Sequence, residues 1–72
     1  EQIMKQIAIV EGMKCHHCEI HAENEVKKIP GIKEVKANFK EKEVIIDSEE
    51  EIKEEDIAKA ISAAGYQFKG LK

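Results

Sequence analysis

Arginine and tryptophan are absent from this chain of 72 residues, and proline and tyrosine occur once each. The 12 basic residues are therefore all lysines, and the 15 acidic residues outnumber them to give a formal net charge of −3. Proteins that bind nucleic acid usually carry a basic face that neutralises phosphates. Without such a face, we expect no nucleic-acid partner.

Long apolar runs are also absent, although 42% of the residues are hydrophobic. A membrane-spanning helix needs about 18 or more consecutive apolar residues, so we expect a soluble globular protein without membrane insertion. The length predicts a single domain, residues 1–72, whose core is barely large enough to fold unaided. The sequence contains no internal repeat, low-complexity tract or linker.

No signal peptide or transit segment is visible, and the chain begins with Glu1 instead of methionine, so we expect a trimmed chain or a part of a longer protein. The cysteines, Cys15 and Cys18, are too close to act as a structural disulfide, because they would close only a tiny loop. We therefore expect reduced thiols and a cytoplasmic location.

What the sequence does contain is a concentration of metal-binding side chains. Both cysteines and all three histidines fall between Cys15 and His21. Thiolates and imidazoles bind copper, zinc and related ions, and two cysteines separated by two residues can point at one centre. No second C-x-x-C or downstream histidine pair is present to complete a four-ligand zinc site. Cys15 and Cys18 therefore suit an ion that needs few soft ligands, above all Cu(I), with one side open to another protein's thiols.

Neighbouring side chains are candidates for auxiliary roles. His21 follows Cys18 by three helical positions and leans toward the helix start, so its imidazole could be a third ligand, and His17 is a second candidate. For both histidines we favour exposed positions without ligation. For Met13 we favour core packing over a thioether ligand. The cation of Lys14 should offset the charge of a Cu(I)-dithiolate and lower the pKa of the thiols.

Hydropathy patterns predict the first half of the fold. The apolar run from Ile3 to Val10 predicts a central strand that Glu11-Gly12 ends. A helix is predicted from His17 to Pro30-Gly31, because an apolar stripe recurs at helical spacing while polar residues take the other faces. The stripe comprises Cys18, Ala22, Val26 and Ile29, and the polar residues include Glu19 and Glu23.

The second half predicts a hairpin, a helix and a last strand. Residues 32–39 alternate in polarity, residues 40–42 form a turn, and residues 44–46 return as a strand before a polar connection over 47–51. A second apolar stripe ends at the helix-capping Gly65 and has no clear Ser or Thr cap at its start. This stripe comprises Ile57, Ala60, Ile61 and Ala64, and the last strand contains Tyr66, Phe68 and Leu71. The acidic run from Glu49 to Asp56 is interpreted as a solvated helix start.

This order of elements predicts an α+β ferredoxin-like βαββαβ sandwich, in which two helices cover one face of a four-stranded antiparallel sheet. The first helix begins inside the cysteine motif. The positive end of its macrodipole should therefore favour the thiolate form of Cys18.

The motifs of the chain resemble the heavy-metal-associated domain family over nearly the whole length. These motifs are Gly12-Met13-Lys14-Cys15-His16-His17-Cys18, Pro30-Gly31-Ile32 and Ala63-Ala64-Gly65-Tyr66. The family includes cytosolic copper chaperones and the amino-terminal domains of copper-transporting P-type ATPases. The resemblance implies Cu(I) held by Cys15 and Cys18, Met13 as a buried loop anchor, and Tyr66 close to the site as a shielding residue. Lys14 departs from the family, which more often has Thr, Ser or Asp there, and an Asp is associated with Zn(II).

We therefore predict a non-enzymatic Cu(I) metallochaperone that passes copper to a partner by thiolate exchange. The resemblance implies that this partner is a copper-transporting P-type ATPase or a copper-responsive regulator. The alternatives are a metal-binding domain cut from such an ATPase and a carrier of Hg(II) or Zn(II). A dithiol-disulfide oxidoreductase is disfavoured, because Pro30 ends a helix and no proline remains for the cis-Pro of a thioredoxin-like groove. We expect a monomer, with a metal-bridged dimer as the alternative.

Overall fold

The computed structural model describes residues 4–72, so Ile3, predicted in the first strand, lies outside the described residues. Six elements follow one another along the described chain. They are β1 (Met4–Glu11), α1 (His16–Lys27), β2 (Ile32–Asn38), β3 (Glu43–Ser48), α2 (Glu54–Ala63) and β4 (Gln67–Leu71). Neither of these helices is long and apolar enough to cross a membrane.

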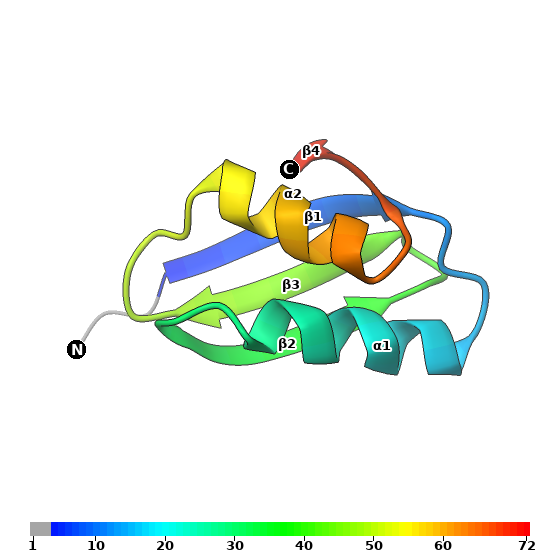
Figure 1. Ribbon diagram of the computed structural model, residues 1–72, viewed down its shortest axis with the longest axis horizontal. Coiled ribbons are helices and arrows are strands. Elements are labelled where there is room, and N and C mark those ends of the chain that lie inside the picture. The colour runs from blue at the N-terminus through cyan, green and yellow to red at the C-terminus, as the bar shows by residue number, and fades with distance from the viewer. Residues whose placement is uncertain (1–3) are drawn as a thin grey trace.

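The described strands form one antiparallel sheet in the order β2-β3-β1-β4. Both helices lie on the same face of this sheet (Figure 1). The predicted ferredoxin-like α+β fold is therefore confirmed, and so is the central position of β1, which pairs with β3 on one side and with β4 on the other.

The core lies between the sheet and the two helices. Alternate residues of the central strands point toward the helices and are fully buried, because successive side chains of a strand face opposite sides. The helices contribute the apolar stripes that the sequence predicted. The buried apolar residues of these four elements are Ala8, Val10, Val44, Ile46, Ala22, Val26, Ile57, Ala60 and Ile61.

Some predicted boundaries are wrong by a few residues. Asp47 and Ser48, predicted in the connection after the hairpin, belong to β3, because both pair with β1 and β2. Ser48 is fully buried, and its hydroxyl donates a hydrogen bond of 2.6 Å to the carbonyl of Glu50, which satisfies its polar group. Phe39 and Ile29 lie just beyond the ends of β2 and α1, although both still pack against the core.

The last strand departs from simple alternation. Ile9 pairs with Gly70, whereas Val10 pairs with Phe68, so β4 contains one extra residue opposite this step. Gly70 has a φ of 128°, a backbone conformation that glycine adopts without strain. Leu71 lies in β4 as predicted and pairs with Ala8, although its side chain is 37% exposed, whereas Tyr66, also predicted in the last strand, lies just before β4.

Truncation of a core isoleucine should destabilise the fold far more than truncation of an exposed one. Ile61 is fully buried on α2, whereas Ile20 on α1 is 43% exposed. We expect Ile61→Ala to lower the free energy of unfolding by about 2–5 kcal/mol, because it loses burial and leaves a cavity. Ile20→Ala should change it by about 0.5 kcal/mol or less. Urea denaturation measures both, and equal losses would contradict this account of the core.

Candidate metal-binding site

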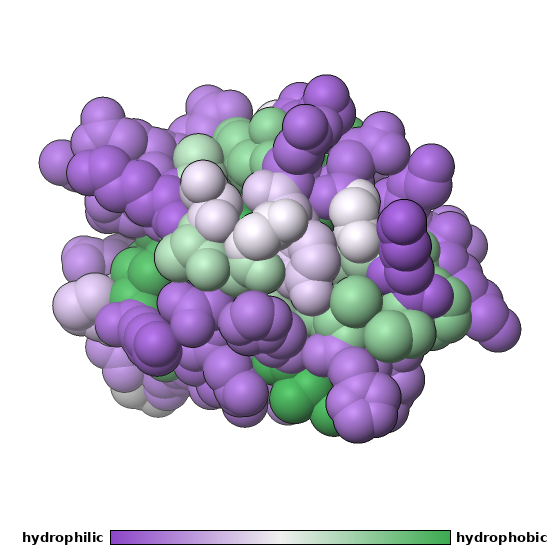
Figure 2. Space-filling model, turned by 45° about the vertical axis from the view of Figure 1, so that its right-hand side comes forward, coloured by the Kyte–Doolittle hydropathy of each residue, from purple (hydrophilic) through white to green (hydrophobic). Residues whose placement is uncertain are grey.

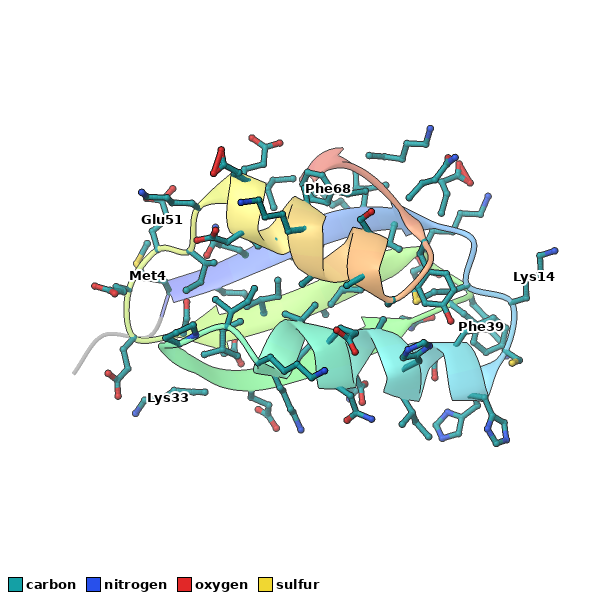
Figure 3. The ribbon with its side chains drawn as sticks, in the orientation of Figure 1. Met4, Lys14, Lys33, Phe39, Glu51 and Phe68 are labelled. Atoms are coloured by element: carbon teal, nitrogen blue, oxygen red, sulfur yellow. The ribbon has the colours of Figure 1, made fainter. Side chains whose placement is uncertain are left out.

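The connection from β1 to α1 carries the cysteine motif to one end of the sandwich (Figure 1). Met13 is only 7% exposed and belongs to the core, whereas its neighbours Gly12 and Lys14 are exposed. The Lys14 side chain extends away from this end of the molecule (Figure 3). One buried side chain thus anchors a loop that is otherwise open to solvent.

Tyr66 reaches the same loop from the other helix. Its backbone N–H donates to the carbonyl of Ile61 at 3.1 Å, and the N–H of Gly65 donates to Ser62 at 2.9 Å. With Gly65 at a φ of 93°, this is a Schellman cap, which ends α2 and fixes the position of the next residue. A Cβ on Gly12 would lie 3.2 Å from Tyr66 Cδ1, so the absence of a side chain there allows the ring to pack against the loop.

The two thiols lie at the start of α1. Cys15 is the N-cap residue, and its carbonyl accepts hydrogen bonds from the N–H groups of Cys18 and Glu19 at 3.0 and 3.3 Å. The helix therefore begins at His16, one residue earlier than predicted. The Sγ atoms of Cys15 and Cys18 are 3.6 Å apart, and neither forms a disulfide. With metal–sulfur bonds of about 2.3 Å, one ion can bridge sulfurs up to ~4.6 Å apart, so a single ion can contact both.

Hydrogen bonds favour the ionised form of Cys18. The Tyr66 hydroxyl makes the largest contribution and a backbone hydrogen bond from Lys14 the next, and together they lower the pKa of the Cys18 thiol to about 7 against the opposing effect of burial. The same interaction raises the pKa of Tyr66 to about 12, because a tyrosinate could not donate to the sulfur. At neutral pH the Cys18 thiol is therefore more readily ionised, and more ready to bind a metal, than an ordinary thiol.

Two expectations about the thiol environment need correction. The Lys14 ammonium group was expected to lower the thiol pKa, but Lys14 acts on Cys18 through its backbone. Tyr66 was expected only to pack over the site, yet its hydroxyl is the main partner of the sulfur. The residue pattern could indicate that a tyrosine follows the second helix, but not where its hydroxyl points.

The histidines do not join the thiols. In the described part of the chain, no three Cys, His, Asp or Glu side chains come together as a metal site. His17 and His21 are exposed, and the His21 ring lies edge-on to Tyr66 with its centroid 6.1 Å away. The Nδ1 atom of His16 lies 2.9 Å from the Glu19 carboxylate. The structure thus brings Cys15 and Cys18 together, without the auxiliary ligands considered from the sequence.

Glu19 was predicted only to lie on the polar face of the first helix, but its carboxylate makes specific contacts with Phe39 and His16. Its Oε2 atom accepts a hydrogen bond of 2.8 Å from the backbone N–H of Phe39, and Oε1 contacts His16. The side chain is only 14% exposed. The Phe39 N–H, followed by His16, holds the pKa of the Glu19 carboxyl below its usual value. Helical spacing alone could not identify this contact, because it depends on where the second strand ends.

Removal of the Tyr66 hydroxyl should raise the pKa of Cys18. Tyr66→Phe keeps the ring that packs against Gly12 but removes the donor to the sulfur, so the pKa should rise from about 7 toward the usual thiol value. In the reduced, metal-free protein, the alkylation rate of Cys18 measured against pH reports this change. We expect a several-fold slower reaction at neutral pH. An unchanged profile would show that the hydroxyl does not control this thiol.

The chain was compared with known proteins, and its sequence is similar to that of a copper-handling protein. It is 42% identical over 65 residues to the copper chaperone CopZ of Enterococcus hirae, a match that covers 89% of this chain and 94% of that protein.

Two solved structures resemble it closely. The CopZ metallochaperone superposes with a TM-score of 0.85 at 25% identity, over 92% of this chain and all of that one (100%). The N-terminal domain of a potential copper-translocating P-type ATPase from Bacillus subtilis, in its Cu(I)-loaded state, superposes with a TM-score of 0.79 at 27% identity, over 99% of this chain and 92% of that one.

A family match agrees with the motifs and the fold. Residues 7–67 match the heavy-metal-associated domain, and this range includes the thiol pair, both helices and Tyr66. The chain belongs to the heavy-metal-associated domain family.

Proposed function

We propose that this protein is a Cu(I) metallochaperone in which Cys15 and Cys18 hold the ion. The observation that carries the proposal is the pair of free thiols 3.6 Å apart on an open loop, one of them with a pKa lowered to about 7. Because metal binding requires the thiolate form, a thiol with a lowered pKa costs little free energy to deprotonate when a soft cation binds. The similarity to a copper chaperone supports the same conclusion.

The donor set favours Cu(I) over Zn(II). Zinc sites usually have four ligands, or three with an open position, whereas two soft thiolates suit Cu(I). Within the described residues no third Cys, His, Asp or Glu is gathered with the pair. Hg(II) is also soft, so the choice between copper and mercury depends on which ion the cell supplies.

The proposed transfer is a stepwise exchange of thiolates. A cysteine of the partner loses its proton and adds to the bound Cu(I), which gives a three-coordinate ion shared by the two proteins. One of the original Cu–S bonds then breaks, and that thiolate can take up a proton. Each bond formed is followed by one broken, so the ion is never free in water and no redox step is needed.

The surface at this end of the molecule permits close approach. Figure 2 turns the loop end forward and shows a band of weakly polar and apolar residues between two hydrophilic regions. A partner surface can approach this band without stripping water from many charges. We propose that the partner is a copper-transporting P-type ATPase or a copper-responsive regulator in the cytoplasm, where thiols stay reduced.

The structural similarity to an ATPase N-terminal domain supports a second candidate, in which this chain is itself a metal-binding part of such a transporter. Both candidates require the same thiol pair and the same exchange chemistry. They differ in whether the acceptor site lies on a separate protein or on the same chain.

The metal preference can be tested by competition. The reduced protein, kept free of oxygen, is titrated with Cu(I) against a Cu(I) chelator and separately with Zn(II) against a zinc chelator. We expect tight binding of one Cu(I) per chain and much weaker zinc binding. Cys15→Ser and Cys18→Ser should each abolish tight Cu(I) binding, because the ion would then keep only one thiolate ligand.

Circular dichroism of the two serine variants provides the control, since the fold should persist without either thiol. A preference for zinc that depends on His17 or His21 would overturn the copper assignment.

The affinity for Cu(I) should also fall as the pH drops below about 7, because protons then compete with the metal for Cys18.

A further inference from the structure

We propose that Glu19 is a positioning residue of the metal site: its carboxylate fastens the first turn of α1 to the end of β2, and thereby holds Cys15 and Cys18 at bridging distance. This proposal rests on the proposed Cu(I) binding. It assigns a role to a residue that touches neither the thiols nor the ion.

The first turn of α1 has few other attachments. Cys15, the N-cap residue, makes no side-chain capping hydrogen bond, so its side chain remains available to the metal. His16 and His17, which follow it, are exposed, whereas Cys18 packs against the core. Glu19 is the charged residue of this turn whose side chain is mostly buried, at 14% exposure.

The attachment point of Glu19 is held by the core and by a hydrogen-bonded turn. Phe39, whose N–H donates to Glu19 at 2.8 Å, packs against the core directly after β2. The following turn is closed by Asn38, whose Oδ1 accepts the N–H groups of Lys40 and Glu41 at 3.0 and 3.1 Å. Phe39 lies at the end of the molecule that carries Lys14 and the metal loop (Figure 3). The carboxylate therefore joins the helix start to a fixed part of the sheet.

A second carboxylate provides a matched control. Glu23, one turn further along α1, accepts a hydrogen bond of 2.9 Å from the N–H of Ala37 in β2. Glu23 ties the helix to β2 itself and Glu19 ties it to the residue just after β2, but only Glu19 is adjacent to a thiol. Loss of either contact should destabilise the fold. Only loss of the Glu19 contact should also disturb the distance between the two sulfurs.

The test compares the Cu(I) affinities of Glu19→Ala and Glu23→Ala by competition with a chelator. We expect Glu19→Ala to bind Cu(I) about 10-fold more weakly, the range found for residues that orient metal ligands, and Glu23→Ala to bind as the wild type does. Removal of a negative charge near an anionic copper–dithiolate should by itself strengthen binding. A loss of affinity therefore cannot come from the charge, which leaves altered geometry or general destabilisation as its cause.

Further variants separate positioning from general destabilisation. Glu19→Gln keeps an oxygen that can accept from Phe39 and should restore most of the affinity. Glu19→Asp keeps the charge but has a shorter reach, so it should weaken binding and replaces Glu19→Ala if that variant does not fold. Unfolding in urea, measured for all variants, should show similar losses for Glu19→Ala and Glu23→Ala.

Unchanged affinity in the Glu19→Ala and Glu19→Asp proteins would overturn the proposal, and so would equal losses in the Glu19→Ala and Glu23→Ala proteins. The proposed function has a separate test, since it fails if the wild type does not bind Cu(I) tightly or if the Cys15→Ser and Cys18→Ser proteins bind it equally well. A negative result for Glu19 alone leaves Cu(I) binding by the thiols intact.

Discussion

Burial of one face of the sheet under two helices is the constraint on which the metal site depends. It places the end of β1, the buried side of α1 and the end of α2 close to the cysteine loop. Met13 joins the loop to that core, while the cap of α2 presents Tyr66 to it. A loop this open to solvent would otherwise sample many conformations, and ordering it only when metal binds would reduce affinity.

The charge of the site is stabilised by hydrogen bonds, with little help from neighbouring cations. Tyr66 and the backbone of Lys14 donate to Cys18, and the only lysine in the loop extends into solvent. Neutral donors favour the thiolate without competing with the metal for it, because they attract one lone pair and leave the others free.

The sequence was sufficient to predict the order of elements, the central strand and the cysteine pair, because hydrophobic periodicity and ligand type are local properties. It was not sufficient where the outcome depends on contacts between distant segments. Ser48 extends β3 because two neighbouring strands pair with it, and the bulge in β4 sets which residue of that strand lies opposite Ala8. The bonds of Tyr66 to Cys18 and of Glu19 to Phe39 join residues that lie far apart in the chain.

The two thiols are unequal, and this inequality bears on how a tightly held ion could still be released. Cys15 is exposed and lies on the loop, whereas Cys18 is half-buried on the helix and bonded to Tyr66. In the proposed exchange, a partner thiolate would therefore meet the ion from the Cys15 side, where the thiol is exposed. The Cys15 sulfur, which has fewer supporting contacts, would then be the ligand displaced more readily, because its displacement would disturb neither the helix nor the cap of α2. Tight binding and rapid exchange are compatible when one ligand is fixed and the other is accessible.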